Sequence, residues 1–152
     1  MTRLGIGIAV AALVAVPLAL AQPAGVPPTI SDYWSWTRLN IDRSTDNPTG
    51  AHPQSKDIYI NLDPAEIVAA GGQPIIPFPE GTIVVKERND AGRLLVDRLY
   101  MMEKTGGAWV YRVFDRQADG SFRGQDYGTA NFCRDCHAAA PTDFVFVQFE
   151  RR

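Results

Sequence analysis

Apolar and polar residues alternate along much of the chain, which is the pattern of strands that bury one face. Turn-forming stretches such as Asn-Asp-Ala-Gly and Thr-Gly-Gly separate successive runs, so neighbouring runs are expected to pair as an antiparallel meander. The runs that predict strands are residues 57–62, 82–88, 93–104, 108–116 and 143–150. We therefore expect an α+β fold class that is mainly antiparallel β-sheet, with a few short helices.

The helical patterns are short and lie between or beside these strands. Residues 29–41 carry aromatic and apolar side chains at helical spacing behind a Ser-Asp pair that can cap a helix. Asp63 followed by Pro64 is a favourable helix start, which predicts a helix over residues 63–70. A third helix is expected over residues 129–139, near the C-terminus.

The first residues have the composition of an export signal. Arg3 supplies a basic start, residues 4–20 are apolar or small, and an Ala-Leu-Ala site follows. We expect residues 1–21 to be a signal peptide cleaved near Ala21/Gln22, which predicts a periplasmic protein. The alternative is a membrane anchor, since about 17 apolar residues are at the lower limit for a bilayer span.

The rest of the chain, residues 22–152, has the length of one domain. Within it, residues 22–56 are expected to form a leader, an amphipathic helix and a loop, and residues 57–152 the β-rich remainder that carries the motif described next. The full chain has 15 Lys and Arg against 17 Asp and Glu; without Arg3 the basic residues number 14, and they are scattered. This distribution gives no phosphate-binding footprint, so nucleic acid is not an expected partner.

Two cysteines and a histidine form the motif Cys133-Arg-Asp-Cys136-His137. On a helix, positions i, i+3 and i+4 share one face. The two thiols can then reach the two vinyl groups along one edge of a haem while the imidazole reaches the iron. C-x-x-C-H is the haem-attachment signature, and histidine is the usual proximal ligand. The motif predicts a covalently attached haem c, bound through Cys133 and Cys136, with His137 as the iron ligand.

Three other roles for the cysteines are weighed against haem attachment. A thioredoxin-type redox pair is expected within a βαβ pattern, which is missing here. A zinc site needs four ligands, and His52 is the only further histidine. A disulfide is common in exported proteins, but it leaves His137 without a role.

The sixth ligand of the iron, opposite His137, is predicted less directly than the motif. The 15 residues after His137 contain no Met, His or Lys, so a sixth protein ligand must come from upstream. The candidates are His52, Met101, Met102 or a lysine, although a loop histidine is often exposed and strand methionines often pack a core. The leading hypothesis is five-coordinate iron with an open face for gases or small nitrogen ligands. The alternative is an electron-transfer cytochrome c whose sixth ligand is His52 or a methionine.

Several segments outside the motif also occur together. They are an aromatic N-terminal segment, DIYIN at residues 57–61, FPEGTIVVKE at residues 78–87, and TDFVF at residues 142–146 after the motif. With the meander, they resemble the cytochrome P-460 / cytochrome c′-beta family over most of the mature chain. The resemblance implies a mainly antiparallel sheet, often a homodimer, and a high-spin five-coordinate haem.

The resemblance implies two activities. The cytochrome P-460 branch oxidises hydroxylamine with a haem that is cross-linked to a lysine, while the c′-beta branch binds nitric oxide or carbon monoxide in a distal pocket capped by phenylalanine. Enzyme activity, as a hydroxylamine or nitric-oxide oxidoreductase with a redox partner protein, therefore stays open. Lys86 can point toward the haem edge as the cross-link, or be an exposed strand lysine. Phe78 can cap the distal pocket, or pack in the core.

Overall fold

The structure is a computed structural model, and part of the chain is described. The described residues are 24–40, 44–46, 52, 54–89 and 95–146, with the backbone alone for 44–46 and 54–56. The predicted signal peptide and the second half of the predicted last strand lie outside them. Within the described ranges, no helix has the length and apolar character needed to cross a bilayer.

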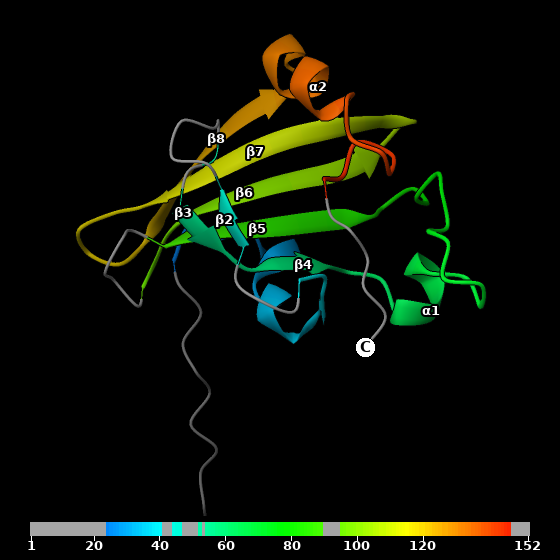
Figure 1. Cartoon of the computed structure of the whole chain (residues 1–152). Coiled ribbons are helices and arrows are strands. Elements are labelled where there is room, and N and C mark those ends of the chain that lie inside the picture. Colours follow the sequence, from blue (N-terminus) through cyan, green and yellow to red (C-terminus); the bar gives the residue numbers. More distant parts are fainter. Residues whose placement is uncertain (1–23, 41–43, 47–51, 53, 90–94, 147–152) are drawn as a thin grey trace, which may run out of the picture.

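One antiparallel sheet forms the body of the described chain (Figure 1). Its six strands follow the order β1–β4–β5–β6–β7–β8. Their bounds are β1 (Thr37–Arg38), β4 (Ile58–Ile60), β5 (Ile83–Asn89), β6 (Val96–Thr105), β7 (Ala108–Arg116) and β8 (Phe122–Gly128). Two further strands, β2 (Ser44–Asp46) and β3 (Gln54–Lys56), pair with each other, and β3 packs against β5. The predicted α+β class with a mainly antiparallel sheet is confirmed.

The meander β5–β6–β7 forms where the alternating pattern predicts it. Thr105 pairs with Ala108, so Gly106 and Gly107 make a two-residue hairpin turn. Both glycines have positive φ, 60° and 77°, which is the backbone that this tight turn requires and that glycine adopts without strain. The turn is therefore encoded locally.

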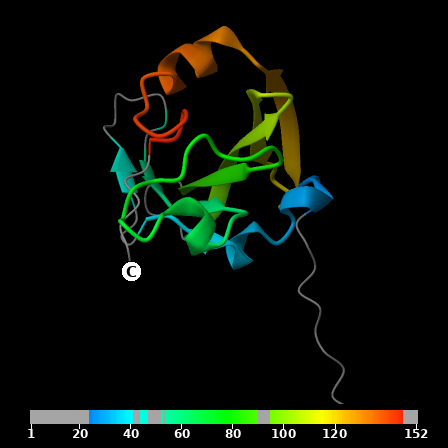
Figure 2. The same cartoon turned by 90° about the vertical axis from the view of Figure 1, so that its right-hand side faces the viewer.

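Alternation along the strands divides the sheet into two faces. We call one the back face, formed by residues such as Ile83, Val85, Leu99 and Phe114. The N-terminal 3₁₀ turns η1 (Pro28–Ile30) and η2 (Tyr33–Ser35) cover it, and the Tyr33 hydroxyl donates a 2.7 Å hydrogen bond to Glu87. We call the other the cavity face; its core members include Ile58, Val84, Met102 and Tyr111. Figure 2 shows the η turns, in blue, far from helix α2, in orange, with the sheet between them.

The predicted helix over residues 29–41 is wrong. Two 3₁₀ turns and strand β1 replace it, because the chain becomes extended at Trp36 and continues into the pairing with β4. The Thr37 hydroxyl adds a 2.6 Å hydrogen bond to the carbonyl of Leu62, which fixes this edge of the sheet. Long-range pairing with β4 therefore overrides the local helical spacing.

The predicted last strand is also wrong over its described part, residues 143–146. Asp143 and Phe144 have φ values of 43° and 69°, so the chain turns there instead of extending. An isolated bridge joins Thr142 to Val145, and the Thr142 hydroxyl donates a 2.6 Å hydrogen bond to the Val145 carbonyl. The alternating Phe and Val residues of this segment therefore do not describe a strand.

Helix α1 (Pro64–Ile67) begins at the predicted residue and ends earlier than expected. The Glu66 carboxylate accepts a 2.9 Å hydrogen bond from the backbone N–H of Asp63, which stabilises the helix start. Strand β8 is not predicted by the pattern, because its residues are mostly polar and include two glycines.

Candidate cofactor site

Helix α2 (Asn131–His137) lies within the range predicted from the sequence and carries the whole motif. Cys133, Cys136 and His137 all line one cavity of about 270 Å³. The i, i+3, i+4 spacing therefore does bring two thiols and an imidazole to the same hollow, as the haem-attachment hypothesis requires.

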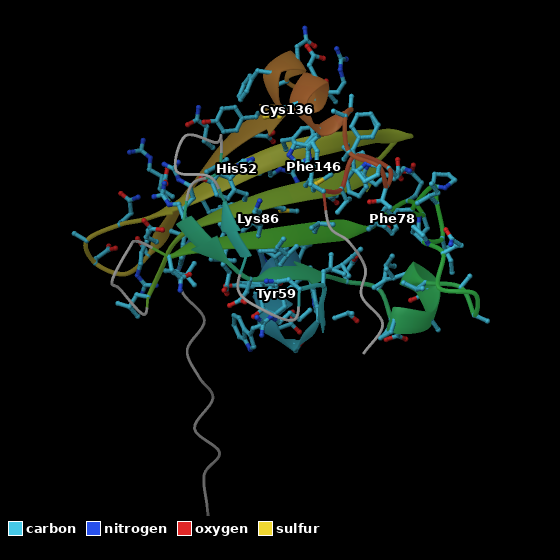
Figure 3. The ribbon with its side chains drawn as sticks, in the orientation of Figure 1. His52, Tyr59, Phe78, Lys86, Cys136 and Phe146 are labelled. Atoms are coloured by element: carbon cyan, nitrogen blue, oxygen red, sulfur yellow. The ribbon has the colours of Figure 1, made fainter. Side chains whose placement is uncertain are left out.

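The cavity lies between α2 and the cavity face of the sheet. Ile58, Val84, Met102 and Tyr111 supply its floor, and Phe146 lines it from the turn that follows α2. His52, between β2 and β3, lines it from another part of the chain. Figure 3 shows His52, Cys136 and Phe146 on the side of the sheet that carries α2, and Tyr59 on the opposite side.

The His137 ring is oriented by the backbone that follows it. Its Nδ1 lies 2.7 Å from the carbonyl oxygen of Phe144, so Nδ1–H donates to that carbonyl. The other nitrogen, Nε2, then carries the lone pair that a metal requires. Burial lowers the pKa of His137, and the charge of Lys86 lowers it further, while the hydrogen bond with Phe144 opposes both. The ring is therefore a neutral imidazole in the tautomer suited to bind iron.

A buried ion pair holds the turn that presents the Phe144 carbonyl. Lys104 Nζ lies 2.7 Å from Asp143 Oδ2, and the two side chains are 9% and 14% exposed. The same carboxylate oxygen accepts a 2.8 Å hydrogen bond from the backbone N–H of Phe78. These contacts hold Asp143 in a left-handed conformation that non-glycine residues rarely adopt. The orientation of His137 thus depends on strand β6 through this turn.

The two thiols are unpaired in the structure. Cys133 is half-buried and Cys136 is exposed, and no disulfide joins them. Burial raises the pKa of the Cys133 thiol, with a contribution from Cys136, so it stays protonated at neutral pH. Over the described ranges, no three His, Cys, Asp or Glu side chains gather as a group that could hold a bare metal ion. The zinc and disulfide alternatives therefore gain no support.

The residues around the cavity fit a large flat apolar group. Phe132 and Phe146 line it, yet they are 66% and 53% exposed, so the fold leaves two aromatic rings uncovered beside the motif. The Tyr111 hydroxyl is buried in the cavity wall and has no hydrogen-bond partner among the described residues. A haem attached to α2 would cover the rings, and the two thiols and His137 are the donor set that holds one.

A second set of side chains lines the cavity away from α2. His52 lies edge-on to Tyr100 with 4.3 Å between ring centroids, and its centroid is 6.2 Å from that of His137. Burial lowers the pKa of His52 to about 4, and the charge of Lys86 contributes to this shift, so the ring is neutral. Lys86 also lines the cavity, from β5, where it pairs with Tyr100 and Ile58 in register. The structure thus brings His52 and Lys86 together with the motif.

Other residues named from the sequence lie elsewhere or play a different part. Phe78 is 2% exposed and packs edge-on against Trp109, outside the set of residues that line the cavity, which supports the packing alternative. Met101 and Met102 are both buried and both contribute to the cavity lining. Tyr100 is a lining residue that no sequence motif marks. The feature that identifies it is strand pairing, because Tyr100 on β6 pairs with Lys86 on β5.

A β-sheet with a C-x-x-C-H helix beside a largely apolar cavity defines a haem-binding cytochrome. Comparison with known proteins gives the family: a family model for cytochrome P460 matches residues 30–147, which is most of the chain. The chain therefore belongs to the cytochrome P460 family, and haem is the cofactor that the family implies. A search of curated proteins found no match.

Proposed function

We propose that this chain is an exported c-type cytochrome that binds nitric oxide or a related small ligand at its haem iron. In this proposal Cys133 and Cys136 hold one haem through thioether bonds and His137 ligates the iron. The observation that carries it is that all three side chains line one cavity while the Nδ1 of His137 is already hydrogen-bonded to the Phe144 carbonyl. Nε2 is left to bind the iron.

The chain's own residues would set the conditions for ligand binding. A haem iron held by one histidine supplies a sixth position at which a small molecule can bind. Val84, Ile58 and Met102 give the cavity an apolar floor. His52, Lys86 and Tyr100 add polar groups there. Five-coordinate iron, as expected from the sequence, leaves the position open whenever no protein group reaches it.

Haem attachment and ligand binding are tested on the haem-loaded protein. The denatured wild-type protein is expected to keep the mass of one haem, and the Cys133→Ser/Cys136→Ser variant to lose it. Asp135→Asn is a matched control, because Asp135 lies inside the motif but is exposed. The reduced protein should change its absorption spectrum on addition of nitric oxide or carbon monoxide. No haem on the denatured wild type, or no spectral response to either gas, would contradict the proposal.

Hydroxylamine oxidation is a second candidate function, and the position of Lys86 favours it. Lys86 lines the cavity, as a lysine that cross-links to the haem must. The denatured, protease-digested protein is expected to hold haem on a peptide from β5 as well as on the motif peptide. Lys86→Ala should abolish that linkage and hydroxylamine-dependent reduction of an electron acceptor, while Lys56→Ala should leave both intact. Haem held by two thioether bonds alone would rule out this branch.

Electron transfer is the third candidate, and it needs a protein ligand on the sixth position. Its test is the same addition of carbon monoxide to the reduced protein with the opposite expected result, because carbon monoxide should bind poorly.

For every candidate we propose a periplasmic location, a redox partner protein and a homodimer. N-terminal sequencing of the secreted protein, expected to begin near Gln22, and light scattering of the purified protein check location and assembly.

A further inference from the structure

His52 lies close to His137, the expected iron ligand, although the two residues are far apart in the sequence. It comes from the connection between β2 and β3, 85 positions before His137, yet both rings line the same cavity. Their centroids are 6.2 Å apart and their planes cross at 70°. Tyr100, on the sheet, supports the His52 ring edge-on with 4.3 Å between centroids. The arrangement therefore brings a second imidazole into the cavity, with its centroid 6.2 Å from that of the expected iron ligand.

The separation of the two rings matches two imidazoles that share one metal ion. Metal–nitrogen bonds to histidine are about 2 Å long, and the ring nitrogen lies about 1 Å from the ring centre, so two such rings are about 6 Å apart. A ligand molecule inserted between iron and His52 would need a larger separation. Two imidazoles that ligate one metal ion can adopt any angle between their planes, so the 70° seen here is compatible with a shared iron.

One nitrogen of the His52 ring is not used by the described part of the chain. Its Nδ1 is buried and has no hydrogen-bond partner among the described residues. A buried polar atom without a partner is destabilising, so such groups often mark a site for something that is bound. The other polar residues on this side, Lys86 and Tyr100, lie on the sheet itself, whereas His52 approaches from a separate connection.

We infer that His52 occupies the sixth position of the haem iron in the resting protein and yields it to an entering ligand. The inference rests on the proposed haem site, and it replaces the five-coordinate iron expected from the sequence with iron held by His137 and His52. On this assignment, His52 would have to leave that position before a small ligand could occupy it. His52 would thereby decide which ligands bind, since a weak ligand cannot displace it.

The test uses the haem-loaded protein and its His52→Leu variant, with Leu95→Ala as a control at an exposed position that does not line the cavity. Electron paramagnetic resonance and absorption spectra are expected to show low-spin iron with two histidine ligands in the wild type and in Leu95→Ala. His52→Leu should be high-spin, and added imidazole should restore the low-spin spectrum to His52→Gly. The apparent carbon monoxide affinity should rise in His52→Leu by about tenfold for each 1.4 kcal/mol by which the iron–His52 bond favours the closed form.

Two results would overturn the inference. One is high-spin iron in the wild type, unchanged by His52→Leu. The other is low-spin iron that persists in His52→Leu, since another group would then be the ligand. Neither result bears on the proposed binding of small ligands. That proposal is tested separately, by whether the spectrum of His52→Leu responds to carbon monoxide and nitric oxide. If that variant is high-spin and binds neither gas, the proposed function fails while the assignment of His52 stands.

Discussion

The two faces of the sheet differ in how completely they are packed. On the back face, Ile30, Val85 and Leu99 are almost fully buried beneath the N-terminal turns, and the Tyr33 hydroxyl has its acceptor in Glu87. On the cavity face, two aromatic rings near α2 stay exposed and the buried hydroxyl of Tyr111 has no partner among the described residues. One face stabilises the fold by itself, and the other is shaped for a group that the chain does not supply.

This difference gives the two faces separate energetic roles. Changes on the back face should lower the free energy of unfolding and leave the haem spectrum alone. Changes on the cavity face should alter the haem spectrum more than stability. The ion pair of Lys104 and Asp143 is the exception, because it combines tight packing with control of the turn that orients His137.

The largest loss of stability is expected when the ion pair of Lys104 and Asp143 is broken. Lys104→Met leaves the Asp143 carboxylate buried without its cation and should destabilise the protein by about 3–5 kcal/mol in urea unfolding. Because the turn then loosens, the haem spectrum should change as well. The exposed pair Arg134–Asp135 is the control, and Asp135→Asn should cost less than about 1 kcal/mol. A Lys104→Met protein of wild-type stability and spectrum would show that the turn does not depend on the pair.

Truncation of the back-face core should be the next largest effect. Leu99 is 1% exposed, so Leu99→Ala leaves a cavity and should cost about 2–5 kcal/mol. The haem spectrum should not move, because Leu99 lies on the face opposite the cavity. Leu95→Ala, at a position that is 62% exposed, is the matched control and should change the unfolding midpoint little. A shifted haem spectrum in Leu99→Ala would mean that the two faces are coupled.

Removing one hydroxyl from each face compares them most directly. Tyr33→Phe deletes the donor to the buried Glu87 carboxylate and should cost about 1.5–3 kcal/mol, as expected for a hydrogen bond to a charged group. Tyr111→Phe removes a hydroxyl without a partner among the described residues and should be close to neutral. Urea unfolding of both haem-loaded variants checks the pair. A large loss in Tyr111→Phe would indicate that the haem itself supplies the missing partner.

The smallest expected change in stability is at the rim of the cavity. Phe146 is 53% exposed, so Phe146→Ala should lower the free energy of unfolding by less than about 1 kcal/mol. Its effect should appear instead in the haem absorption spectrum, because the ring lies 5.5 Å from His137 between centroids. An unchanged spectrum would place Phe146 away from the haem.

Sequence predicts best what short-range chemistry encodes. The strands around Gly106 and Gly107 follow from alternation and a local turn, and the motif predicts its own helix because the three ligating groups need one helix face. The turn at Asp143 is not predictable in this way. Its conformation depends on Lys104, 39 positions away, and the alternating Phe and Val residues suggest a strand instead.

The surroundings of the motif are harder to predict for the same reason. Sequence marks His52 as a loop residue, and its approach to His137 depends on how β3 packs against β5. Lys86 is predicted to share a strand face with Val84, and both do line the cavity. Which strand residues lie across from it, such as Tyr100, becomes visible when the register of β5 and β6 is known.

The place of α2 in chain order has a consequence for how the protein is made. Within the described residues, every strand of the sheet precedes Cys133, and chains are synthesised from the N-terminus, so these strands are made before the motif. The cofactor can therefore meet a formed sheet when the thiols arrive. Folding of the sheet and attachment of the haem would then compete in time. Variants that slow the sheet, such as Leu99→Ala, should change how much of the protein matures with haem even though they never contact it.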